Sequence, residues 1–185
     1  MAFLPILRMK VVISLRTTSA NLTAWAILRQ LLTVPNSLVI ETSLETGLRV
    51  SDVLAFKSAD LIKGQRFTVS ESKTGKRRRI YIGKKLYLRL VEQRGKTWVF
   101  PNSRDPRRHR TRQAVWADVK RAARALRLGG NIAPHSARKS YACAEYERTH
   151  DLSAVQSKLN HSHLETTVLY LLDVLSPQNG TKVLF

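Results

Sequence analysis

Apolar residues recur at helical spacing in the first third of the chain. In the segment 21–33 they are Leu22, Ala26, Leu28 and Leu32, whose spacing suits one face of a helix. Two shorter segments follow with helix-compatible patterns. Together these patterns predict helices over residues 21–33, 37–46 and 51–57.

The breaks between these helices carry residues that end or begin them. Pro35 and Asn36 interrupt the first pattern. Gly47 follows the second, where a left-handed residue commonly closes a helix, and Ser51 is a candidate N-cap for the third.

The pattern then changes to strand alternation. Residues 66–71 and 78–82 alternate β-branched or aromatic side chains with polar ones, and the five residues between them include Gly75. This arrangement predicts a β-hairpin with the glycine in its turn. We expect residues 59–62 to add an edge strand.

Helical spacing returns in the second half of the chain, after a basic loop at 94–110 around Trp98. The glycine pair 129–130 is expected to close the long helix that precedes it. The predicted helices cover residues 84–93, 111–128, 135–149, 151–159 and 163–173. The fold class is therefore mainly α with a small antiparallel β-sheet. One domain is expected over 21–173, with an extension or linker at 1–20 and a tail at 174–185.

Composition excludes several classes of protein. The chain has 185 residues, of which 43% are hydrophobic and 24% charged, so a wholly disordered chain is excluded. A lone cysteine, Cys143, excludes an intrachain disulfide and a cysteine-rich zinc site, and favours a reducing cytoplasm. Arg8 and Lys10 divide the apolar N-terminal segment, so we expect a soluble protein with no membrane partner.

The charge indicates a polyanionic partner. The net charge is +19, and 22 basic but only 5 acidic residues lie between Lys57 and Arg127. Apolar residues interrupt this region at structural periods, so it is expected to form a folded basic surface that binds DNA or RNA. The candidate DNA-binding residues are Lys76, Arg77, Arg78, Arg107, Arg108, Arg110, Arg112 and Lys139.

A set of residues suits the cleavage of a phosphodiester bond without metal. Tyr170 is a candidate nucleophile, and Arg49 and Arg138 offer planar guanidinium groups that match two phosphate oxygens. Lys73 is a candidate general acid for the departing oxygen. Two histidines can bind the phosphate or move the proton of the tyrosine: His135 and His161. His161 and His163 lie close together, but no cysteine or carboxylate cluster accompanies them, so no metal site is expected.

The stretches that carry these residues resemble the tyrosine recombinase (phage integrase) family. Its signature is Arg, Lys, His-x-x-Arg, His and Tyr in that order, and the resemblance runs from about Leu22 to Asp173. It implies the family's catalytic-domain fold and a site-specific recombinase that cleaves and rejoins DNA through a 3′-phosphotyrosine intermediate, without metal, ATP or another cofactor. It also implies action as a homo-oligomer, a dimer or tetramer, on DNA.

Each assignment has a structural alternative. Arg49 could pair with Asp52, which is otherwise expected to support it, and Lys76 could replace Lys73. Tyr170 could be a core residue. The other histidines, His150 and His163, are expected on the surface. We expect Cys143 to be a buried, small apolar residue. The tryptophans are expected in the core rather than on a surface that stacks on bases: Trp25, Trp98 and Trp116.

The chain departs from the family pattern in sequence and length. Asn160 replaces the usual glycine before the second histidine and can adopt its left-handed backbone, while Ala137 replaces a leucine. Residues 1–20 are too short for the family's N-terminal DNA-clamping domain, so we expect a catalytic domain alone or a naturally minimal form. The tail is expected to dock on a neighbouring protomer or on its own domain. The rival functions are a type IB topoisomerase-like enzyme and a DNA-binding module that has lost catalysis.

Overall fold

The computed structural model describes residues 18–128 and 131–175. Two strands and a series of helices follow in the order α1 (Thr18–Gln30), α2 (Val34–Thr46), α3 (Val50–Leu54), α4 (Ser58–Ile62), β1 (Arg66–Ser70), β2 (Arg77–Tyr81), α5 (Lys84–Gln93), α6 (Arg112–Ala125), α7 (Pro134–Thr149), α8 (Leu152–Leu159) and α9 (Leu164–Leu175). The predicted class, mainly helical with one small antiparallel sheet, is confirmed. In this described part, no helix is long and apolar enough to cross a membrane.

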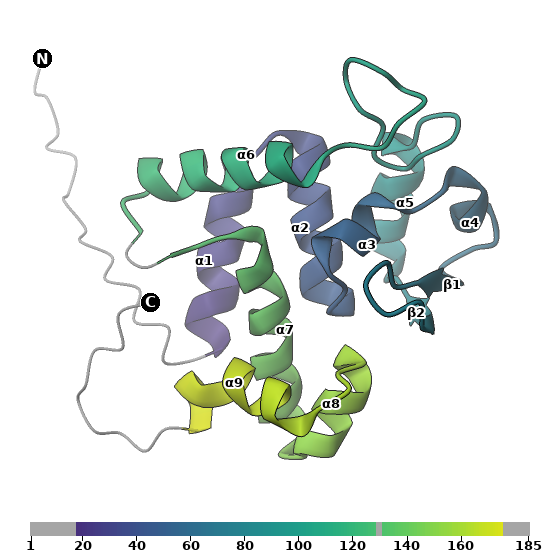
Figure 1. The fold of residues 1–185 in the computed structure, drawn as a ribbon. Coiled ribbons are helices and arrows are strands. Elements are labelled where there is room, and N and C mark those ends of the chain that lie inside the picture. Colours follow the sequence, from purple (N-terminus) through teal and green to yellow (C-terminus); the bar gives the residue numbers. More distant parts are fainter. Residues whose placement is uncertain (1–17, 129–130, 176–185) are drawn as a thin grey trace, which may run out of the picture.

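The helices form a bundle with one group of elements beside it and another group below it (Figure 1). Figure 1 shows α6 lying across the upper ends of α1 and α2, with α7 in front of them. The short helices α3 and α4, the hairpin and α5 lie on one side of the bundle, whereas α8 and α9 pack below against α7. A large apolar core joins α1–α6 and the sheet, and a smaller cluster joins α7–α9.

The hairpin has one core face and one basic face. Its register pairs Phe67 with Ile80, and both side chains are buried, as the alternating pattern predicts. The ring of Phe67 meets that of Phe56 edge to face at 5.2 Å between centroids. The exposed face carries Arg77 and Arg79, which leaves charge available at the sheet surface.

Two local predictions at helix ends are confirmed. Gly47 closes α2 in a left-handed conformation, with φ +68°, and its N–H donates to Ser43 O at 2.9 Å. A Cβ at this position would lie 2.4 Å from a ring carbon of Tyr141, so only glycine fits. Asn160 closes α8 with φ +56°, the backbone conformation expected of it.

Three local predictions are wrong. Residues 58–62 form the helix α4, not an edge strand, because Leu61 reaches the core from a single helical turn. Ser51 does not cap α3, whose N-cap is Arg49. Trp116 is 50% exposed on the outer face of α6, whereas Trp25 is buried as predicted.

Several expectations lie partly or wholly outside the described residues. These concern the extension before Thr18, the glycine pair 129–130 and the tail after Leu175. Within the described part, α1 begins at Thr18 and α9 ends at Leu175, a few residues beyond each predicted bound. Cys143 is buried, and His150 and His163 are on the surface, as predicted.

Candidate active site

The junction between α2 and α3 positions the first arginine. After Gly47 turns the chain, Arg49 adopts an extended backbone at the start of α3. Its Nη1 lies 2.6 Å from Oε2 of Glu71, whose side chain is fully buried. A buried carboxylate with one charged partner fixes that partner strongly, because the charge is costly to leave alone. Arg49 is therefore held by Glu71 and not by Asp52.

Asp52 instead supports the lysine-bearing turn of the hairpin. Its Oδ1 accepts hydrogen bonds from the backbone N–H of Ser72 at 2.9 Å and from the Ser72 hydroxyl at 2.6 Å. The hydroxyl of Thr74 donates to Glu71 at 3.3 Å. Both neighbours of Lys73 are thus tied to the arginine region, while Lys73 itself is exposed and makes no hydrogen bond or ion pair with another described residue.

The second arginine lies on α7 and is fully buried. Nη1 of Arg138 donates to the Gly47 carbonyl at 2.7 Å, and Nη2 donates to the Leu159 carbonyl at 2.6 Å. These bonds join α7 to the end of α2 and the end of α8. Burial and the nearby guanidinium of Arg49 lower the pKa of Arg138. Two arginines held this close repel each other, so the site favours an anion that both can contact.

Tyr170 lies between the two histidines. Its hydroxyl is 2.6 Å from Nε2 of His135, and its ring meets both imidazoles edge to face, with centroids 5.2 Å from His135 and 4.9 Å from His161. The ammonium of Lys139 lies 6.0 Å from the centroid of the Tyr170 ring. The aromatic body of Tyr170 is half-buried beside the small core, while its hydroxyl enters the site.

The environment keeps both histidines neutral near pH 7. Partial burial and the positive charges of Arg138 and Lys139 lower the pKa of His135. Burial, with Arg138 and Arg49, lowers the pKa of His161 to about 4. A neutral His135 can accept a proton at Nε2, which makes it a suitable base for the phenol.

A buried threonine orients His161. The hydroxyl of Thr167 lies 3.1 Å from Nδ1 of His161. Nε2 is therefore the ring nitrogen left to face the site. The sequence patterns did not single out either Thr167 or Glu71. The repeated Thr-Thr before Tyr170 offered a faint signal for the first. Nothing in the local sequence indicated the second, because Glu71 acts across 22 residues.

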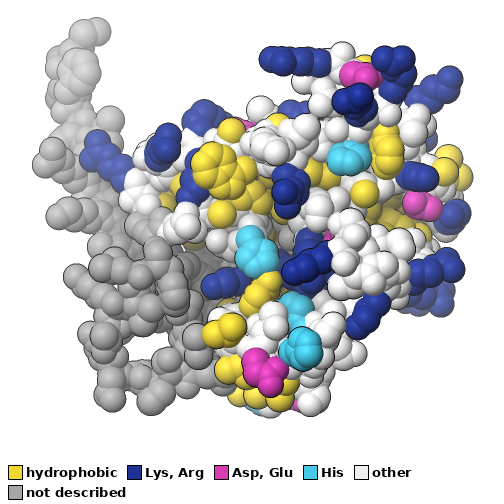
Figure 2. Space-filling view, viewed as in Figure 1, with side chains coloured by type: hydrophobic (Ala, Val, Ile, Leu, Met, Phe, Trp, Pro, Cys, Tyr) yellow, Lys and Arg dark blue, Asp and Glu magenta, His cyan; other side chains and the backbone are white. Residues whose placement is uncertain are grey.

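The structure thus brings together five of the six predicted catalytic residues: Arg49, His135, Arg138, His161 and Tyr170. Figure 2 shows histidine side chains across the middle of one face, with Lys and Arg side chains beside them. Further Lys and Arg side chains gather toward the hairpin and the loop before α6. Within the described residues, no group of three His, Cys, Asp or Glu side chains could hold a metal ion.

The predicted DNA-binding residues divide into exposed and anchored groups. Arg78 donates to the Thr46 carbonyl at 2.6 Å, and Arg110 donates to Asn36 at 2.7 Å, so these two hold the fold together. Arg107 and Arg108 remain largely exposed beside Asp105. The other exposed members are Lys76, Arg77 and Arg112, and Lys139 is half-buried.

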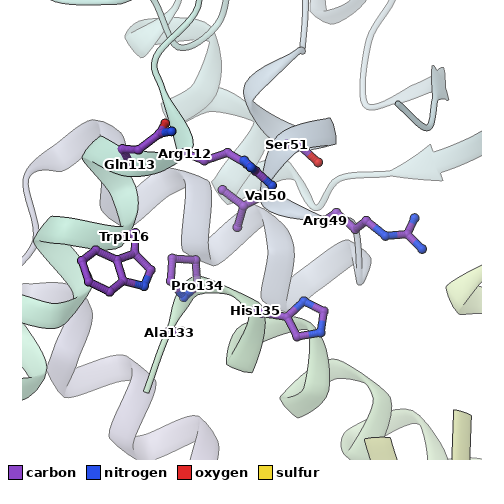
Figure 3. Close-up of a pocket in the computed structure, with 9 residues that line it drawn as sticks. All are labelled: Arg49, Val50, Ser51, Arg112, Gln113, Trp116, Ala133, Pro134 and His135. Atoms are coloured by element: carbon purple, nitrogen blue, oxygen red, sulfur yellow. The ribbon is translucent and has the colours of Figure 1, made fainter. Parts of the chain in front are cut away.

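A pocket adjoins this cluster of side chains. It has a cavity volume of ≈ 350 Å³ and lies between the start of α3, the first turns of α6 and the start of α7 (Figure 3). Arg49 and His135 line one end of it, and Trp116 forms part of the wall on α6.

Comparison with known proteins shows the family of this chain. The sequence model of the phage integrase family matches residues 12–173. The chain is 30% identical over 146 residues to the tyrosine recombinase XerD of Halalkalibacterium halodurans, covering 73% of this chain and 48% of that protein. It is also 30% identical over 132 residues to the probable integrase/recombinase YoeC of Bacillus subtilis, covering 69% and 72%. The chain spans about half the length of the XerD relatives.

Solved structures share the fold. The XerH site-specific recombinase bound to its difH substrate superposes with a TM-score of 0.67 at 20% identity, over 83% of this chain and 49% of that one. A lambda integrase dimer bound to a COC′ core site gives a TM-score of 0.67 at 21% identity, over 90% and 50%. The predicted catalytic-domain fold is confirmed by these likenesses, and the chain belongs to the phage integrase family.

Proposed function

We propose that this chain is the catalytic domain of a site-specific DNA recombinase that cleaves and rejoins DNA strands through Tyr170. One observation carries the proposal most directly: the Tyr170 hydroxyl lies 2.6 Å from Nε2 of a neutral His135. A nucleophile within hydrogen-bond distance of its base is the arrangement that covalent catalysis needs.

The cleavage step follows from these positions. The phenolic oxygen of Tyr170 attacks the phosphorus and gives its proton to His135, while the bond from phosphorus to the 5′-oxygen breaks. Arg49, Arg138 and His161 stabilise the charge on the phosphate oxygens, since pre-placed donors are commonly the largest catalytic contribution. Lys73, on the exposed turn, donates a proton to the departing 5′-oxygen.

The product is a 3′-phosphotyrosine bond and a free 5′-hydroxyl. Because one phosphodiester bond is exchanged for another, a second 5′-hydroxyl can reverse the step and rejoin the strand without ATP. The partner in this proposal is double-stranded DNA. The exposed members of the basic set hold the phosphate backbone, and a dimer or tetramer assembles on the site.

Covalent trapping tests the chemistry. The protein is incubated with a library of nicked duplexes that carry a randomised core, and adducts that survive denaturation are recovered and sequenced. Wild type should give adducts, and Tyr170→Phe should give none. Tyr146→Phe, which changes a tyrosine beside His150 outside the site, is the matched control and should behave as wild type.

The other outcomes identify the rivals. DNA binding without an adduct would favour a binding module that has lost catalysis. Adducts accompanied by relaxation of supercoiled plasmid, without exchange between two sites, would favour a topoisomerase-like enzyme. An adduct with Tyr170→Phe would show that the nucleophile is another residue.

A further inference from the structure

The pocket beside the catalytic side chains has a chemical character of its own. Its lining includes Val50, Ala133 and Pro134, which offer carbon surface and no charge. Trp116 forms one wall, and half of its side chain surface remains exposed to solvent. A large apolar ring in this position would stay in contact with water unless a flat apolar group covers it.

Cationic and polar groups surround that ring. Arg112 and Gln113 lie one turn before Trp116 on α6 and line the same pocket. One turn beyond it, the ammonium of Lys120 lies 5.7 Å from the centroid of its ring. An exposed aromatic ring with a cation over it and an arginine beside it is a combination that binds the bases of nucleic acids, where stacking supplies affinity and charge holds the backbone.

The pocket and the catalytic cluster share two side chains, Arg49 and His135. A phosphodiester held by these residues carries a nucleoside on each side. Because both nucleosides are covalently joined to that phosphate, one of them should lie near Trp116. The DNA substrate itself can therefore fill the pocket, and no second ligand is required.

We infer that this pocket receives the base of a nucleotide next to the phosphate that Tyr170 attacks, with one face of the base stacked on Trp116. In a continuous duplex both faces of a base are covered by its neighbours, so this base leaves the helical stack when the DNA binds. Unpairing costs a few kcal/mol, and stacking on an aromatic side chain contributes about 1–3 kcal/mol in return. The inference rests on the proposed function, because it places the phosphate at Tyr170.

The first test measures DNA affinity in the Tyr170→Phe background, so that no strand is cut. A labelled duplex selected from the random library by retention on this protein is the probe, and fluorescence anisotropy gives Kd. Trp116→Ala should raise Kd about 5- to 150-fold, which is 1–3 kcal/mol converted at 1.36 kcal/mol per tenfold. Trp116→Phe should recover much of this loss. Leu88→Ala removes an apolar side chain that is exposed to a similar extent on α5, and should leave Kd near that of the parent protein.

The second test locates the base. A single abasic residue is moved through every position of both strands, and Kd is measured for the parent and for Trp116→Ala. At one position the change in Kd caused by the abasic residue should differ between the parent and Trp116→Ala, since the ring and the base are two halves of one contact. A mismatch at that position should strengthen binding by the parent only, because the base is then easier to unpair.

The position must also be the right one. Sequencing of wild-type adducts on the same duplex maps the phosphate that is attacked, and the coupled base must adjoin it. Coupling at no position, or at a base remote from that phosphate, overturns the inference. If wild type forms no adduct at all, the proposed function fails, and the abasic scan still reports separately whether a base binds Trp116.

Discussion

The ion pair between Arg49 and Glu71 gives a prediction in which catalysis and DNA affinity change in opposite directions. Glu71 is only 1% exposed, and its carboxylate is 2.6 Å from Nη1 of Arg49. Glu71→Gln keeps the shape of the side chain but removes its charge. The guanidinium remains, yet the carboxylate that fixed its direction is lost.

The expected magnitudes follow from this geometry. A hydrogen bond to a charged group contributes about 1.5–3 kcal/mol, and Arg49 retains 21% exposure, so water replaces part of the interaction. We expect the free energy of unfolding to fall by about 1–2 kcal/mol. Loss of a positioned donor commonly slows reactions by about 10²–10³, and a donor that is present but misdirected should cost about 10- to 100-fold.

The assay measures single-turnover adduct formation at saturating protein, on a duplex recovered in the covalent-trapping experiment. The Kd for the same duplex is measured in parallel. The rate should fall while DNA affinity holds or rises, because the variant gains one unit of positive charge. Glu41→Gln is the matched control. Glu41 pairs with Arg89 at 2.6 Å and with Arg29 at 3.2 Å, away from the site, so its loss should lower stability without slowing adduct formation.

Three results would refute this reasoning. Glu71→Gln could form adducts at the wild-type rate, which would mean that Arg49 needs no fixed direction. Glu41→Gln could slow the reaction equally, which would make the effect one of general stability. A parallel loss of DNA affinity would indicate that Glu71 shapes the binding surface rather than the transition state.

Three further predictions concern the turn lysine, the pH dependence and the α2–α3 junction. Lys73→Ala should slow adduct formation by a factor of about 10²–10⁴. A substrate with sulfur in place of the 5′-oxygen should restore most of the rate, because the sulfur leaves without a proton. The assignment of Lys73 as the general acid fails if Lys76→Ala shows this pattern instead. Because the pKa of His135 is lowered from 6.5, this base stays neutral, and the rate of adduct formation should stay constant as the pH falls to 6.5 and decline only below it. A pH–rate profile that already declines above pH 6.5 would contradict the assignment of His135 as the base. Gly47→Ala should lower the free energy of unfolding by about 2–4 kcal/mol in urea titration, since its Cβ would enter the ring of a tyrosine on α7. Gly75→Ala has nearly the same positive φ, +67°, but its Cβ would meet nothing within 4 Å, so an equal loss there would remove the steric explanation.

The sequence by itself determined most of the local elements and the set of candidate catalytic residues. Apolar spacing of 3–4 residues, strand alternation and the residues that end helices act over a few positions, so they can be read along the chain. The left-handed backbone at Gly47 and Asn160 belongs to this class. So does the helix turn that holds His135 and Arg138 on one element.

Contacts between distant elements were decided only by the tertiary structure. The packing of α3 against the hairpin selected Glu71 as the partner of Arg49, across 22 residues, and turned Asp52 toward Ser72. Trp116 adjoins the buried Val115 on α6, so the helical pattern alone could not tell whether another element would cover the ring. The start of α7 lies beside Trp116 but does not cover its ring, so a pocket remains between them (Figure 3). Whether a side chain is exposed depends on which distant segments pack near it, and local sequence does not contain this information.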